Sequence, residues 1–199
     1  MVQQAEADAA WHRTINHDPL HIIGEINDVF SESAFPAVCV DAGTEDDQSY
    51  VTLVVTIPGH EVVIREPRQK GVPPHQRSDR EIADIYSEMV GATIVATAKR
   101  AFAHAPAAVE ARLVVVRWDS GIFSRKHKLG VIYSGTFTRA VCEVDWSSAS
   151  PAEWIASIPD ARIDSSPKRP LRVLSSRKHP ELAGLLADIE QVVTSTAPA

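Results

Sequence analysis

The chain has few cysteines, and this scarcity excludes several classes of protein. Its two cysteines, Cys39 and Cys142, are too few for a disulfide framework or a cysteine-based metal knuckle. Each lies in an apolar or strand-like run, so we expect two buried, reduced thiols that are not bonded to each other. Because the cytoplasm keeps thiols reduced, the pattern favours a cytoplasmic protein.

Long apolar runs are also absent. No stretch approaches the ~20 consecutive apolar residues that span a bilayer. The first residues, MVQQAEADAAWHR, contain no apolar segment that could serve as a signal peptide. The sequence therefore predicts a soluble protein with no membrane partner.

The common motifs of nucleotide enzymes, hydrolases and zinc proteases are missing too. The chain contains no G-x-x-x-x-G-K-[ST], no G-x-G-x-x-G, no G-x-S-x-G and no H-E-x-x-H. These absences disfavour a nucleotide enzyme or a hydrolase of the usual kinds. We expect no cofactor.

Basic residues are scarce in the first part of the chain. Residues 1–60 hold one basic residue, Arg13, against ten acidic ones, whereas residues 61–199 hold 19 basic against 16 acidic, which gives net charges of −9 and +3. An acidic N-terminal part and a mildly basic remainder disfavour a dedicated nucleic-acid-binding protein. A local basic patch stays compatible with these charges.

The composition that is present fits one globular core. The 199 residues are 44% hydrophobic and 23% charged, which is ordinary for a globular domain. We expect a polar N-terminal arm over residues 1–17, a single domain over residues 18–193 and a tail over residues 194–199.

Residues 78–105 are predicted to form a long central helix. Ser78 and Glu81 have the spacing of a capping box, and Pro106 ends the helix. Gly91 inside it indicates a kink or a close contact with another backbone. The expected buried residues are Ile82, Ile85, Tyr86, Met89, Ala92, Thr93, Val95, Ala96 and Ala103.

Strands and shorter helices are predicted on both sides of the central helix. Residues 110–118 carry apolar side chains on both faces, which is typical of a strand in the middle of a sheet. The order predicts an α+β domain whose mixed, mostly antiparallel sheet packs on the central helix. The other expected strands are 35–42, 49–57, 61–65, 130–138 and 171–174, and the other expected helices are 18–33, a short one from 150, and 180–193.

One part of this pattern is similar to a known family. The segment from Glu61 through Ile85-Tyr86 and Ala101-Phe102-Ala103 to the strand ending at Trp118 resembles an uncharacterised bacterial domain. The resemblance covers roughly residues 61–158. In that family the domain often follows a short domain of unknown function, which this chain lacks. The resemblance implies no function and no site.

Three groups of residues are candidate sites. His17, His21 and Glu25 are four residues apart, a spacing that on one helix suits zinc. Asp18 and Pro19 begin the helix, however, and so leave His17 outside it. The alternative is a solvated outer helix face.

The second group consists of acids on a helix and on strand ends, Glu25, Asp41, Glu61 and Glu66. Metal-dependent nucleases use clustered carboxylates to hold magnesium beside a phosphate. No lysine follows any of these acids at a spacing of two residues, and acids at strand ends are commonly turn residues.

The third group is basic. Arg125, Lys126 and Lys128 lie in one loop, and Arg68 and Lys70 lie in a proline-rich segment. If the two loops meet, they could bind the phosphates of a nucleic acid. The alternative is a pair of solvated turns.

From these observations the leading hypothesis is a non-catalytic module of the bacterial cytoplasm that binds another protein. The alternatives are a metal-dependent phosphodiesterase or nuclease that uses the four acids, and a weak nucleic-acid or phosphate binder that uses the basic loops. The oligomeric state is left open.

Overall fold

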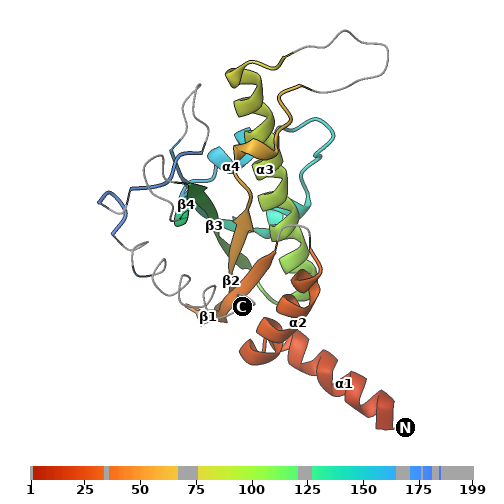
Figure 1. The fold of residues 1–199 in the computed structure, drawn as a ribbon. Helices are drawn as coiled ribbons and strands as arrows, with labels where there is room; N and C mark the ends of the chain where they lie inside the picture. The colour runs from red at the N-terminus through yellow and green to blue at the C-terminus, as the bar shows by residue number, and fades with distance from the viewer. Residues whose placement is uncertain are drawn as a thin grey trace, which may run out of the picture.

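In the computed structural model the chain forms an α+β fold (Figure 1). The structure describes residues 2–33, 36–66, 76–120, 127–164, 171–175, 177–180 and 184. Across these residues no helix has the length and apolar character needed to cross a membrane. The helices are α1 (Val2–Ile15), α2 (Pro19–Ser31), α3 (Asp79–His104) and α4 (Pro151–Ala156), with short 3-10 helices η1 (His60–Val62) and η2 (Arg139–Cys142). The strands are β1 (Ala37–Glu45), β2 (Gln48–Ile57), β3 (Glu110–Ser120), β4 (His127–Thr138) and β5 (Arg162–Ile163).

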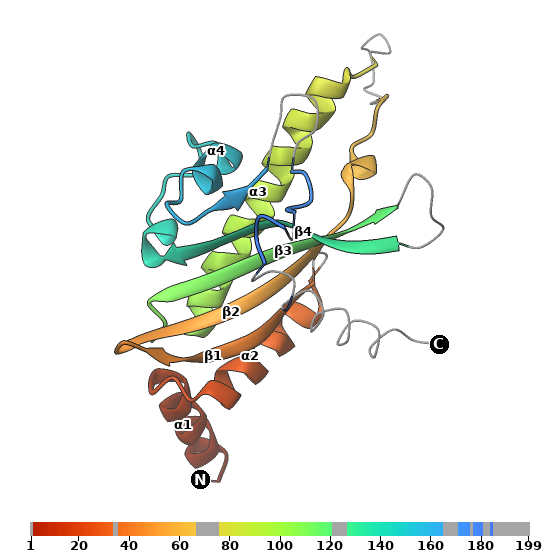
Figure 2. The ribbon, with the colours of Figure 1, turned by 90° about the vertical axis from the view of Figure 1, so that its left-hand side faces the viewer.

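The sheet is mixed and mostly antiparallel, as the sequence predicts. Its order is β1-β2-β3-β4-β5, and among these described strands only the β2–β3 pair is parallel. Parallel neighbours need a crossover connection, and α3 supplies it by running across one face of the sheet (Figure 2). The central position of β3 is confirmed. Leu113 and Val115 belong to the main core on the α3 side, whereas Val114 and Val116 belong to a second apolar cluster on the opposite face.

The two ends of α3 are confirmed. Ser78 Oγ accepts a hydrogen bond from the Glu81 amide at 3.3 Å, and the Glu81 carboxylate accepts one from the Ser78 amide at 2.8 Å. The helix is uninterrupted to His104, two residues before Pro106. Of the two alternatives for Gly91, the close backbone contact is present, because a Cβ atom there would lie 2.6 Å from the backbone nitrogen of Ala152 in α4.

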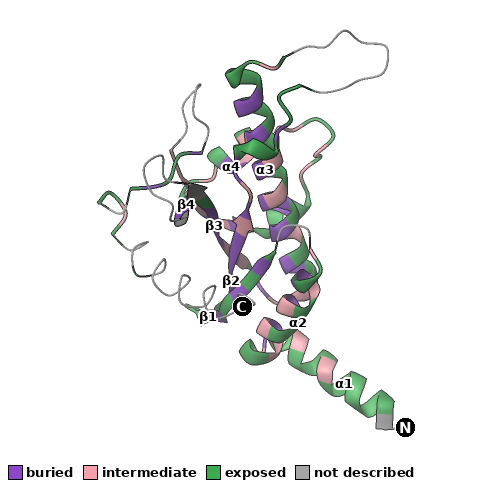
Figure 3. Ribbon diagram, viewed as in Figure 1, coloured by how far each residue is buried: buried purple, intermediate pink, exposed green. Residues whose placement is uncertain are grey.

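The predicted buried face of α3 is partly wrong. Ile85 is 39% exposed, Met89 is only half-buried, and Ala92, Ala96 and Ala103 are exposed. Figure 3 shows that buried and exposed residues alternate along α3. The reason is that α3 packs on the sheet and also on α4 and η2. The face of the helix that these elements bury is therefore wider than predicted, and it lies on a different side. The buried residues are Ile82, Ala83, Tyr86, Val90, Gly91, Ile94, Val95, Thr97, Ala98, Ala101 and Phe102.

Two predicted strands are not formed. Residues 60–62 are the 3-10 helix η1 in place of a strand over residues 61–65. β2 already has β1 on one side and β3 on the other, so no free edge remains beside it for a further strand. Residues 171–174 are not a strand either, although the Leu174 amide donates to the Val131 carbonyl at 2.7 Å. The helix predicted for residues 180–193 lies almost entirely outside the described residues.

The N-terminal arm, for which no helix is predicted, contains α1. Figures 1 and 2 both show this helix projecting away from the sheet, and its main contact is with α2. Nearly all of its described side chains are exposed, including Trp11 at 59% and Ile15 at 41%. Within the part of the chain that the structure describes, α1 is therefore held mainly at its C-terminal end.

The outer edge of β1 is partly closed by α2. The side-chain amide of Asn27 accepts a hydrogen bond from the Cys39 amide at 2.7 Å and donates one to the Cys39 carbonyl at 3.3 Å. A free strand edge is a template for pairing with another chain. Asn27 occupies the edge at Cys39, near the start of β1, and so hinders strand addition there.

The cysteines are free, but the prediction that both are buried is wrong for one of them. Cys39 is buried on β1, and Cys142 is exposed at the end of η2. Burial raises the pKa of the Cys39 thiol to about 11. Cys142 is exposed because the apolar run that contains it ends in a short turn, in which only Val141 points inward.

We expect native protein to react with a thiol reagent once, at Cys142, and unfolded protein to react twice. The physical reason is that a thiolate is the reactive form, and burial suppresses both its formation and its access at Cys39. Mass spectrometry after timed labelling measures this difference, and Cys142→Ser is the control that should remove the fast reaction. Rapid labelling of Cys39 in the native protein would contradict the structure.

Candidate functional site

The histidine and glutamate candidates do not form a metal site. His17 lies in the turn between α1 and α2, outside the helix, with a positive φ of 54° and 5% exposure. Its Nε2 donates to the Tyr50 carbonyl at 3.0 Å, while its buried Nδ1 has no partner. His21 bonds to the Thr14 hydroxyl at 2.9 Å, and Glu25 is exposed.

The four acids do not gather in one place either. Asp41 accepts a hydrogen bond from the Tyr50 hydroxyl at 2.9 Å, and this bond is the main cause that raises the pKa of Tyr50. Glu61 lies in η1 with its carboxylate folded over Gly59, and Glu66 is exposed. Among the described residues, no three His, Cys, Asp or Glu side chains are grouped so that they could hold a metal ion.

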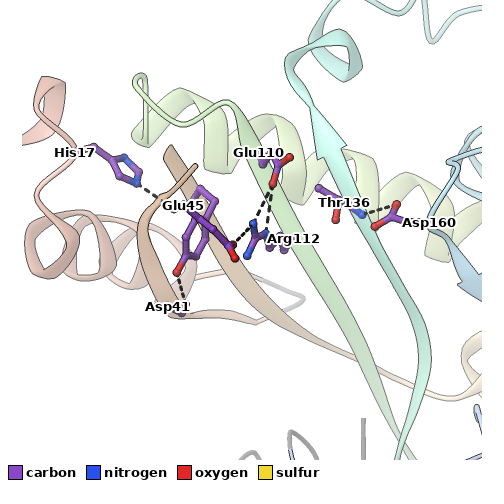
Figure 4. Close-up of polar contacts among 8 residues, drawn as sticks. His17, Asp41, Glu45, Glu110, Arg112, Thr136 and Asp160 are labelled. Atoms are coloured by element: carbon purple, nitrogen blue, oxygen red, sulfur yellow. Dashed lines mark hydrogen bonds and ion pairs between the residues drawn. The ribbon is translucent and has the colours of Figure 1, made fainter. Parts of the chain in front are cut away.

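A polar network lies on the sheet face opposite α3 (Figure 4). Arg112 on β3 pairs with Glu45 at 2.8 Å and with Glu110 at 3.2 Å, and its guanidinium lies 4.1 Å from the centre of the Tyr50 ring. Nearby, Asp160 accepts a hydrogen bond from the Thr136 amide at 3.1 Å. Each partly exposed pair contributes at most about 1 kcal/mol. The network ties β1, β2 and β3 together and leaves Arg112 fully engaged.

The basic candidates fall largely outside the described part of the chain. Arg68, Lys70, Arg125 and Lys126 are outside it, and Lys128 is described only through its backbone in β4. Whether these two loops meet stays a prediction. Arg65, next to the proline-rich segment, forms an ion pair with Asp79 at 2.9 Å.

A groove between α2 and α3 is the candidate site that the sequence interpretation missed. Its volume is about 400 Å³, and α3 supplies most of its walls. Exposed Ala92 and Ala96, one turn apart, leave room beside the larger Met89 and Phe30. The lining residues are Phe30, Ser33, Met89, Ala92, Thr93, Ala96, Thr97 and Arg100. The signal in the sequence is the alanine pair, whose spacing places it on the predicted buried face of the helix.

Arg100 is the charged residue of this groove. Its guanidinium carbon lies 5.1 Å from the centre of the Phe30 ring, a cation–π contact that holds the side chain over the end of α2. The described residues offer it no ion pair and no side-chain hydrogen bond. The groove therefore combines apolar and hydroxyl side chains with one cation that forms no ion pair among the described residues.

No protein-family model, no curated protein and no solved structure matches this chain. The resemblance of residues 61–158 to a bacterial domain consequently stays a prediction. The function has to be argued from the geometry of the chain itself.

Proposed function

We propose that this chain is a non-catalytic, cytoplasmic module that binds a helical segment of a protein partner in the groove between α2 and α3. The observation that carries the proposal is the groove lined by Met89, Ala92 and Ala96, with Arg100 at its side and no ion pair to it from the described residues. Grooves lined with apolar side chains are one of the recurring sites at which proteins bind an amphipathic helix.

The chemistry of the groove defines the partner. Met89, Ala92 and Ala96 present apolar surface, so the partner segment presents apolar side chains. Small residues one turn apart leave a groove into which the side-chain ridge of another helix fits. Arg100 adds a requirement for a carboxylate, because an arginine desolvated without an anion would cost free energy.

The phosphodiesterase alternative has only the sequence pattern behind it. Its four acids offer no group that could hold a metal ion among the described residues. The nucleic-acid alternative depends on loops that lie largely outside those residues. Protein binding is therefore the function that the described geometry supports best.

A photo-crosslinking amino acid at Ala96 tests the proposal in the cells that make the protein. We expect a crosslinked product from position 96 that Arg100→Glu abolishes, because the reversed charge repels the partner's carboxylate. The matched control carries the same amino acid at Asp84, an exposed position of α3 that does not line the groove.

The products are identified by mass spectrometry, so that a partner is recognised by its own peptides. No product from position 96, the same product from position 84, or a product indifferent to Arg100→Glu would each overturn the proposal.

A further inference from the structure

α1 is a helix that buries little of its surface within its own chain. It is 14 residues long, and isolated helices of this length are marginal in water. Trp11 is 59% exposed and Ile15 is 41% exposed. An aromatic side chain of this size buries 150–250 Å² in a good contact, so α1 has much to gain from a partner surface.

One face of α1 has the chemistry that the groove requires. Asp8, Trp11 and Ile15 are three and four residues apart, which places them on the same side of the helix. Asp8 is exposed, and one of its oxygens accepts a hydrogen bond from Gln4 at 2.8 Å. An acid followed by two large apolar residues complements a groove that presents Met89, Ala92 and Ala96 beside Arg100, which has no ion pair among the described residues.

The geometry of the turn directs α1 away from the groove of its own chain. His17 donates to the Tyr50 carbonyl, and Asp18 Oδ1 accepts a hydrogen bond from the His21 amide at 3.0 Å, so both sides of the turn are held. The groove lies at the other end of α2, beside Phe30 and Ser33. In Figures 1 and 2 α1 extends outward from the start of α2.

We propose that α1 of one molecule docks into the α2–α3 groove of a second copy, and that the exchange is reciprocal. Asp8 then pairs with Arg100 of the other copy, while Trp11 and Ile15 cover Met89, Ala92 and Ala96. A reciprocal contact has twofold symmetry, so each interaction occurs twice in the dimer. This inference rests on the proposed function, since it names the occupant of the same groove.

Sedimentation velocity of the purified full-length chain tests the proposal. We expect a monomer–dimer equilibrium within the range of ~1 to ~100 µM that interfaces of modest size show. Trp11→Ala should weaken the dimer at least tenfold. Leu20→Ala is the matched control, since Leu20 is 82% exposed on α2 and does not line the groove, and it should leave the equilibrium unchanged.

A charge exchange tests the orientation of the contact. Asp8→Arg and Arg100→Asp should each weaken the dimer at least tenfold, because each places like charges opposite one another. The double variant should restore it to within a few fold of the wild type, and thermal melting confirms that each single variant is folded. A general loss of structure would not produce this rescue.

A monomeric wild type over the whole range would overturn the self-association, as would equal effects of Trp11→Ala and Leu20→Ala or a double variant that stays monomeric. These results would leave the proposed function standing if position 96 still crosslinks to another protein. If that crosslink is also lost, both the self-association and the proposed function are overturned.

Discussion

Replacing Ile94 with alanine should lower the free energy of unfolding by about 2–5 kcal/mol, the range for removing a large buried aliphatic side chain. Ile94 lies near the middle of α3, is 0% exposed and belongs to the main core between the helix and the sheet. The loss combines the transfer free energy of the removed atoms with the cavity that they leave. Chemical denaturation measures it.

Two other substitutions on the same helix make this result specific for the buried face. Ile85→Ala removes the same atoms from a side chain that is 39% exposed and should cost well under half as much. The loss of stability for Met89→Ala should lie between those for Ile85→Ala and Ile94→Ala, because Met89 is half-buried at the wall of the groove. Equal losses for Ile85 and Ile94 would show that α3 is rotated relative to this structure.

Replacing Gly91 with alanine should destabilise the protein by about 1–3 kcal/mol, the usual cost of overpacking. The new Cβ would lie 2.6 Å from the Ala152 nitrogen and 2.7 Å from the Pro151 carbonyl carbon, and both are backbone atoms that cannot turn aside. Replacing glycine with alanine inside a helix otherwise stabilises it by about 1 kcal/mol. Here the clash makes the same substitution destabilising.

Gly24 provides the matched control. It lies inside α2, and a Cβ atom there would meet nothing within 4 Å, so Gly24→Ala should raise the stability by up to about 1 kcal/mol. Denaturation curves compare both variants with the wild type. Gly91→Ala should also alter tryptophan fluorescence, because Trp154 of α4 stacks on Phe137 with ring centres 5.7 Å apart. A stabilised Gly91→Ala variant would exclude the close approach of α4.

Features that depend on neighbouring residues in the chain were predicted from the sequence. The capping box at Ser78, the end of α3 before Pro106 and the start of α2 after Asp18 are examples. A helix end is decided by hydrogen bonds within one turn, so a few residues carry the information. The fold class was also predicted correctly. The apolar residues on both faces of β3 indicate a strand in the middle of a sheet, although they do not identify the strands beside it.

Features that depend on distant parts of the chain were predicted poorly. The expected strand over residues 61–65 had no edge available, since β3, which begins at Glu110, pairs with β2. The buried arc of α3 depends on where α4 packs, and the contact at Gly91 joins residues about sixty positions apart. The spacing of apolar residues predicts the width of the apolar face of a helix. It does not predict on which side of the helix the neighbouring elements pack.

The sequence by itself determined helix ends, strand propensities and an α+β class, because those follow from local hydrogen bonding and side-chain periodicity. The tertiary structure alone decided which charged residues meet. It joins Arg112 to Glu45 across 67 positions and separates the four acids proposed for a metal. It also places Arg100 beside a groove, where none of the described residues forms an ion pair with it. Coulomb attraction and apolar contact act over a few ångströms of space, so only the folded chain shows which side chains are within reach of one another.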